Sequence, residues 1–292
     1  MISTGGGVHF NDEVNWPELF RDYISRSSLA DPHNPRRSAY ITTMVFLEGG
    51  LREIGDQLSG RSPRSRDELV GARLTREIVV RRAAQVATEL PNAVHVGEGA
   101  FRDRWPGNGG MSNFFMCLIK YTCTAPRWGL FLDYGPRRAL AELPKVREGE
   151  LELTELIEKI ATHDLRMRIR LARYWLFQLS LTIDTKWQAV ATTAYREMLD
   201  AYSTRWAPVY EQGLRMLGVR FRPGVTPATL SMMVSAQTAG FAQHIAATGD
   251  NTTDNRDLFV ASVEALIYAA LDPGDGRDIS EALREILRKR QS

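Results

Sequence analysis

The chain has 292 residues, of which 43% are apolar, 25% charged and 9% aromatic, so it is long enough for one large or two medium globular domains. This composition excludes wholesale disorder and fibrous repeats. A formal net charge of +2 is too close to neutral for a molecule wrapped in nucleic acid or pressed on an anionic membrane, so any basic surface must be local.

No run of residues approaches the ~18 to 20 consecutive apolar positions of a membrane span, and the N-terminus lacks the pattern of a signal peptide. We therefore expect a cytoplasmic protein with no membrane partner. The two cysteines, Cys117 and Cys123, lie six positions apart in one apolar stretch, which favours core positions over a disulfide framework or a zinc site. Neither a metal nor a cofactor is expected.

Helical periodicity dominates the chain, and strand signals are scarce. Residues 40–58 carry apolar side chains at three- and four-residue steps, and a glycine and a proline follow as stop signals. Residues 74–90 repeat this pattern, with Thr75 as the expected N-cap and Pro91 as the stop. The sequence predicts an all-α fold. Further helices are predicted at about 99–105, 110–125, 151–161, 164–181, 184–217, 227–248, 256–271 and 278–290.

Three regions are expected along the chain. Residues 1–38 form an N-terminal extension, residues 39–125 a first domain, and residues 126–292 a second domain. A proline and a glycine interrupt the helical pattern within 141–153, which makes this stretch the best candidate for a boundary between two functional halves.

The most informative segment begins at His95. A short turn is followed by one or two helical turns with Phe101 and Trp105 on one face, and Pro106 ends the helix. The opposite face carries charged side chains, namely Glu98, Arg102 and Arg104. A helix about 10 to 12 Å across fits a DNA major groove about 12 Å wide, and its aromatic face would anchor it to a supporting helix. An ordinary short surface helix is the alternative interpretation of the same spacing.

This segment resembles the turn and recognition helix of TetR-type transcriptional regulators. The resemblance implies an N-terminal helix-turn-helix domain that binds operator DNA. Gly97, Arg102 and Arg104 stand where the family usually has Ser, Tyr and His. Because Glu98 and Asp103 put negative charge beside the DNA backbone, we expect unusual sequence preference or weakened DNA binding. The matching positions are Val96, Gly99, Ala100, Phe101, Trp105 and Pro106.

Residues 163–272 resemble the ligand domain of actinobacterial TetR-like regulators. The likeness lies in a long helix that contains Tyr202, the loop and capped helix that follow it, and two further long helices. It implies a homodimer in which the helices near 227–248 and 256–271 pair with their twins across a two-fold axis.

The first helix of the helix-turn-helix can be placed in two registers. In one register, residues 40–58 are the first helix and residues 74–90 the second. In the other, residues 74–90 are the first helix and the second is nearly absent. We favour the former, because a recognition helix needs a supporting helix that holds it at a fixed angle.

A basic segment precedes the predicted recognition helix. Between positions 61 and 82 the chain has seven arginines and three acidic residues, a local net charge of +4. Such a patch suits contact with phosphates, and a solvated charged face is an equal alternative. The predicted DNA-binding residues are Arg76, Arg81, Arg82, Gly97, Glu98, Arg102 and Arg104.

Aromatic residues, Trp206 and Tyr210 among them, are spread over the helices between positions 128 and 210. Aromatic walls with a few polar groups are typical of a pocket for a drug-sized, largely apolar molecule. For any single residue, an ordinary core position is the alternative. The predicted ligand-binding residues are Trp128, Trp175, Gln178, Thr182, Trp187, Tyr195 and Gln237.

No sequence pattern indicates an enzyme, because the five histidines are scattered and none forms a metal-binding pair. His163 and Asp164 could act as a base with its orienting carboxylate, but adjacent helical residues point about 100° apart. Asp164 is therefore interpreted as a helix cap. A cofactor-independent helical enzyme would require His163 or His244 in an enclosed pocket beside a carboxylate.

The sequence thus leads us to expect a dimeric TetR-like regulator that a small, largely apolar molecule releases from double-stranded operator DNA. The alternative is a TetR-derived helical protein that has lost specific DNA binding and acts as a partner protein or ligand-sequestering module. Glu98, Asp103 and the unusual placement of the first helix favour this alternative.

Overall fold

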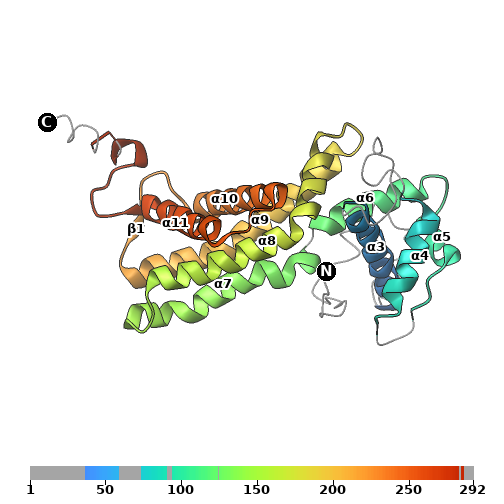
Figure 1. Ribbon diagram of the computed structural model, residues 1–292, viewed down its shortest axis with the longest axis horizontal. Helices are drawn as coiled ribbons and strands as arrows, with labels where there is room; N and C mark the ends of the chain where they lie inside the picture. Colours follow the sequence, from blue (N-terminus) through green and yellow to red (C-terminus); the bar gives the residue numbers. More distant parts are fainter. Residues whose placement is uncertain (1–36, 59–73, 91–93, 124, 283, 286–292) are drawn as a thin grey trace. The chain divides into compact units, whose positions relative to one another are not determined.

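The computed structural model describes residues 37–58, 74–90, 94–123, 125–282 and 284–285. These residues are predominantly helical, which confirms the all-α prediction (Figure 1). The β-structure within these ranges is one short antiparallel pairing of β1 (Arg220–Phe221) with β2 (Leu271–Asp272). No helix in this part of the chain combines the length and apolar composition needed to cross a bilayer.

The chain divides into two compact units that are not contiguous halves of the sequence. The first unit contains Met1–Arg127 and Arg173–Tyr195, and the second contains Trp128–Ala172 and Arg196–Ser292. The predicted boundary near 125 lies close to the first of these divisions. The segment 173–195 also belongs to the first unit. It contains the end of one long helix, residues 153–183, and the start of the next, residues 188–217, so each of these helices has residues in both units.

Four helices open the described part of the first unit. They are α3 (Arg37–Leu58), α4 (Arg76–Ala87), α5 (Glu98–Arg104) and α6 (Gly110–Cys123), which confirms the helices predicted there. Thr75 caps α4 as predicted, since its hydroxyl accepts a hydrogen bond from the backbone N–H of Ile78 at 3.3 Å. Helix α4 packs against both α3 and α5, as the favoured register requires.

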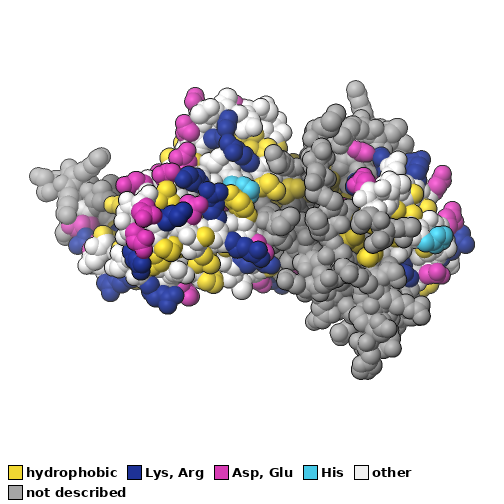
Figure 2. Space-filling view, turned by 90° about the horizontal axis from the view of Figure 1, so that it is seen from below, with side chains coloured by type: hydrophobic (Ala, Val, Ile, Leu, Met, Phe, Trp, Pro, Cys, Tyr) yellow, Lys and Arg dark blue, Asp and Glu magenta, His cyan; other side chains and the backbone are white. Residues whose placement is uncertain are grey.

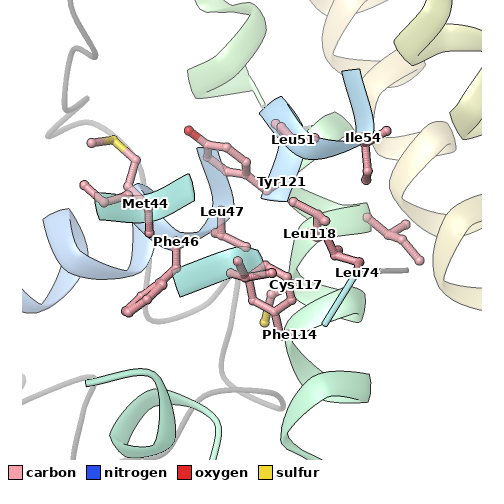
Figure 3. Packing of buried hydrophobic residues seen from close by; sticks show 14 of the residues in the cluster. Met44, Phe46, Leu47, Leu51, Ile54, Leu74, Phe114, Cys117, Leu118 and Tyr121 are labelled. Carbon is pink, nitrogen blue, oxygen red and sulfur yellow. The ribbon is translucent and has the colours of Figure 1, made fainter. Parts of the chain in front are cut away.

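The core of the first unit lies between α3, α4 and α6. Leu47, Leu51 and Leu118 are among its buried side chains (Figure 3). A Cβ atom at Gly49 would lie 2.6 Å from the backbone nitrogen of Ala83, so glycine permits the close approach of α3 to α4. This packing gives α5 a fixed platform.

Three long helices follow, and the first two differ from the sequence prediction. Helix α7 spans Ala125–Glu148 and continues through Pro136 and Pro144, whereas the sequence predicts an interruption at Pro144. Helix α8 is continuous over Leu153–Ile183, where two shorter helices were predicted. Helix α9 spans Gln188–Leu217. Prolines and short polar stretches are weak stop signals inside a helix that tertiary packing supports on one side.

The last two long helices agree closely with the prediction. Helix α10 (Pro227–Thr248) is capped by the Thr226 hydroxyl and ends at Gly249, which has a φ of +75°. Helix α11 (Thr253–Ala270) begins after Thr252, whose hydroxyl accepts from the N–H of Asn255. These two helices pack against each other.

Some predictions concern parts of the chain outside the described residues. They include most of the N-terminal extension over 1–38, the arginine-rich segment 59–73, and residues 283 and 286–290 of the helix predicted at 278–290.

Candidate functional site

Helix α5 is anchored by two aromatic side chains. Phe101 and Trp105 are fully buried, and their rings contact Phe46 of α3 and Phe114 of α6 at centroid separations of 5.0 to 5.9 Å. The indole Nε1 of Trp105 donates to the Cys117 Sγ at 3.4 Å. Seven residues are too few for a stable isolated helix, so this aromatic packing holds α5 in place.

The core around Trp105 contains the buried thiol of Cys117. Burial raises the pKa of the Cys117 thiol to about 12, against the smaller lowering by the Trp105 hydrogen bond. Cys123 is also buried and is a free thiol. Both cysteines are therefore core residues, as the sequence predicted.

The opposite side of α5 is exposed and carries both signs of charge. Arg102 donates to the Glu98 carboxylate at 2.8 Å, and both side chains are more than half exposed. Asp103 is also exposed. Arg104 is half-buried, and desolvation lowers its pKa while the nearby Asp103 raises it. An exposed ion pair at i,i+4 contributes only about 0.3 to 0.5 kcal/mol, so Arg102 can exchange Glu98 for another anion at low cost.

The three predicted DNA-binding arginines of α4 have different surroundings. Arg81 is exposed. Arg82 instead donates to Glu53 and Asp56 of α3, both at 2.8 Å, and Glu53 is almost fully buried. Arg76 lies over the Phe101 ring with 5.7 Å between its Cζ and the ring centroid. Arg81 is thus accessible, whereas Arg82 joins α4 to α3 and Arg76 packs α4 against α5.

The predicted ligand-binding residues lie in several different places. The indole ring of Trp187 lies 4.8 Å from the Phe115 ring at a tilted angle, and Gln178 donates to the Thr122 carbonyl at 2.8 Å, both within the first unit. Gln237 of α10 donates to Ser262 of α11. The Trp128 side chain is outside the described residues. Trp175, Thr182 and Tyr195 also belong to the first unit.

A partly open apolar cavity of about 130 Å³ lies within the second unit, and its lining residues include none of the six predicted residues whose side chains the structure describes. Side chains of α7, α8, α9, α10 and α11 line it. Trp206 and Tyr210, from the aromatic set, do line it. The other walls are mainly aliphatic, with Leu143, Leu156, Ile160, Leu214, Leu230 and Val263 as representatives.

One carboxyl group lines this otherwise apolar space. Asp164 is 6% exposed, and among the described residues no hydrogen bond or ion pair reaches its oxygens. Burial raises the pKa of Asp164 to about 7, although the positive charge of Arg168 lowers it. Asp164 is therefore partly protonated near neutral pH.

The neighbours of Asp164 are themselves buried and polar. Arg168, one turn later on α8, donates to the Ser235 hydroxyl of α10 at 2.8 Å, and its Cζ lies 5.6 Å from the centroid of the Tyr202 ring. Burial raises the pKa of Tyr202, and the negative charge of Asp164 raises it further. Burial likewise raises the pKa of Tyr210.

The helix-capping interpretation of Asp164 is wrong. The sequence prediction placed a helix end between 161 and 164, but α8 continues through these positions, so Asp164 lies inside the helix and cannot cap it. Its side chain lines the cavity. His163 instead stacks on the Tyr134 ring with centroids 3.7 Å apart, and it is not a cavity-lining residue. His244 is exposed. Asp164 thus lacks the adjacent histidine that a catalytic pair would need at the cavity.

A sequence signal for this residue exists. Leu153, Leu156, Ile160 and Asp164 recur at three- and four-residue steps, which places an acidic residue on the apolar face of a helix. A charged residue at such a position is rarely buried without a partner.

The described residues contain no group of three or more His, Cys, Asp or Glu side chains that could hold a metal ion. Comparisons of the chain with protein-family models, with curated proteins and with solved structures find no match.

Proposed function

We propose that the chain is a TetR-like, ligand-responsive transcriptional regulator that binds operator DNA as a homodimer. The observation that carries this proposal is α5, whose aromatic side is fully buried while Glu98, Arg102 and Asp103 are exposed. A short helix held rigidly by a supporting helix, with its polar side facing solvent, meets the requirement for entering a major groove.

The charges near α5 suit a local DNA contact. Arg81 and Arg102 are the exposed arginines of α4 and α5, and they are available to phosphates or base edges. On the face seen in Figure 2, basic and acidic side chains are interspersed, which agrees with the near-neutral net charge. DNA binding would then depend on a few arginines and not on a broad basic surface.

The cavity of the second unit supports regulation by a small molecule. Helix α8 carries Leu156, Ile160 and Asp164 at the cavity, and the same helix carries Phe177 into the core of the first unit. A shift of α8 on ligand binding would therefore reach residues of both units. The ligand can change DNA affinity only by the difference in its binding free energy between the two conformations.

Exposed apolar side chains on α10 and α11 support homodimer formation. Met232 and Leu258 are each 59% exposed and Tyr268 is 79% exposed. On α10, exposed residues at intervals of four positions are small or apolar, namely Ala228, Met232, Ala236 and Gly240. A second copy of the same two helices would bury this face in a self-complementary contact.

Selection from random-sequence duplex DNA tests the proposed function. The full chain is expected to enrich a palindromic site, and Arg102→Ala is expected to relax the preference at one base position in each half-site. Arg81→Ala should lower affinity for all sequences and reduce the slope of log affinity against log salt by about one. Arg166→Ala removes an exposed arginine of the second unit and serves as the control.

The exposed acidic residues of α5 favour a second candidate, a helical protein without specific DNA binding that acts as a partner protein or ligand-sequestering module. Glu98 and Asp103 would repel the DNA backbone. Retained affinity without an enriched palindrome, or no affinity at all, would support this candidate and contradict the regulator.

A further inference from the structure

Two polar side chains that line the cavity differ in their hydrogen bonding. The Thr238 hydroxyl already donates to the Val234 carbonyl at 2.7 Å within α10. Asp164 has no hydrogen bond from any described residue, and it is more than nine-tenths buried. Because a buried carboxylate without a partner is unfavourable, this group is the strongest recognition element in the cavity.

The nearest positive charge is already engaged elsewhere. Arg168 donates to the Ser235 hydroxyl and lies against the Tyr202 ring, and it is not a cavity-lining residue. Its positive charge lowers the pKa of Asp164 by less than burial raises it. A ligand that fills the cavity would exclude water from Asp164, so the ionised form of Asp164 would need a hydrogen-bond donor or a positive charge from the ligand itself.

We propose that the cavity selects a small apolar molecule that carries a protonated amine, with the ammonium group paired to the Asp164 carboxylate. This inference rests on the proposed function in one respect, because it takes the cavity as the binding site of the regulating small molecule. An engineered cavity of about 150 Å³ in another protein binds benzene, so a cavity of similar volume accommodates one six-membered ring. The aliphatic walls and Trp206 would contact the ring.

The pairing has a pH dependence of known sign. The ammonium group binds the ionised form of Asp164, so amine affinity rises as pH increases through about 7 and stays constant until the amine itself loses its proton at alkaline pH. The charged and titratable groups nearby are Arg168 on the same helix and Tyr202 and Tyr210 on α9. Burial raises the pKa values of both tyrosines, so they stay neutral in the range where Asp164 titrates.

Calorimetric titration of the full chain with benzylamine and with benzyl alcohol tests the proposal. These two probes have nearly equal size, and they differ in charge. Benzylamine is expected to bind the wild-type chain more tightly than benzyl alcohol at pH 8, and to release a proton on binding at pH 6.5. The proton is detected by repeating the titration in buffers of different ionisation enthalpy.

Two variants separate the carboxylate from the rest of the cavity. Asp164→Asn is expected to weaken benzylamine binding at pH 8 by at least about tenfold, to abolish proton release and to leave benzyl alcohol binding nearly unchanged. Thr238→Val alters another polar lining residue and should keep the preference for the amine. Retained binding of benzyl alcohol shows that each variant is folded.

The proposal is overturned if both probes bind the wild-type chain equally, if neither binds, or if Asp164→Asn keeps the preference for benzylamine. These results are independent of DNA binding. Failure of the DNA selection with retained amine preference would contradict the regulator and leave the ligand class intact.

Discussion

At the scale of single residues, burial decides which of two similar side chains has a structural role. Arg81 and Arg82 are adjacent in the sequence, yet only Arg82 contacts the buried Glu53. Glu53 also accepts from Gln57 at 3.2 Å, so the carboxylate belongs to a partly buried network between α3 and α4. Sequence alone gives both arginines the same predicted contact with phosphate.

Arg82→Ala is therefore expected to destabilise the fold by about 2 to 4 kcal/mol, because it leaves Glu53 buried without its guanidinium partner. Arg81→Ala should change the free energy of unfolding by less than about 0.5 kcal/mol. Urea unfolding of both variants measures the difference. Equal stability of the two variants would show that the ion pairs of Arg82 contribute little.

Asp164→Asn should make the protein more stable at alkaline pH. The pKa of Asp164 is raised in the folded state, so the stability lost to its ionisation increases from about pH 4, where an unfolded aspartate titrates, up to about pH 7. The amide has no such loss. Thermal unfolding from pH 5 to pH 8 is expected to give a Tm advantage that grows up to pH 7 and then levels off. A constant difference in Tm across this range would contradict the raised pKa.

At the scale of elements, a short helix depends on its packing and a long helix tolerates poor local signals. Helix α5 has seven residues and no side-chain cap at Gly97, whereas α7 continues through two prolines. Helix α5 is stable despite its short length because the rings of Phe101 and Trp105 pack against Phe46 of α3 and Phe114 of α6.

Trp105→Ala should cost about 3 to 5 kcal/mol of stability, since it removes a fully buried ring from an aromatic core. Arg102→Ala on the exposed face of the same helix is the matched control, with an expected change under about 0.5 kcal/mol. Chemical denaturation compares them. A small effect of the Trp105 variant would mean that α5 is not held by its aromatic side.

Two glycines beside the cavity should respond oppositely to alanine. At Gly213 of α9 a Cβ atom would lie 3.8 Å from Leu143, an ordinary contact, so Gly213→Ala should stabilise the helix by about 0.5 to 1 kcal/mol. At Gly135 of α7 it would lie 2.8 Å from the Trp206 ring, so Gly135→Ala should destabilise by about 1 to 3 kcal/mol. Thermal unfolding distinguishes the two, and the same sign for both would contradict the packing around Trp206.

At the scale of the whole molecule, the proposed homodimer rests on the exposed apolar side chains of α10 and α11. Met232, Leu258 and Tyr268 belong to helices whose other faces are buried within the second unit. Isolated exposed apolar residues are common, but several large ones on two helices that pack against each other favour an interface.

The double variant Met232→Glu with Tyr268→Glu is expected to convert the proposed dimer to a monomer, because it would place like charges opposite one another across a two-fold axis. Ile183→Glu changes another exposed apolar residue, 81% exposed on α8, and should leave the dimer intact. Sedimentation velocity measures the assembly state. A dimer that survives the double variant would place the interface elsewhere.

The helical class, the bounds of α10 and the inward face of α5 could be predicted from the sequence, because each depends on local periodicity and capping. Thr226, Pro227 and Gly249 mark the ends of α10 with groups that act within one turn. Phe101 and Trp105 lie four positions apart, and this spacing alone puts them on one face of a helix.

Only the tertiary structure decided where the cavity lies, which arginine joins α4 to α3, and which carboxyl group is buried without a partner. These features depend on side chains far apart in the sequence, such as Leu143, Asp164 and Val263 around one space. Packing of several helices determines which residues face the same volume, and periodicity within one helix cannot specify its neighbours. For this reason the sequence indicated an aromatic pocket, whereas the folded chain forms a largely aliphatic cavity with one acidic side chain.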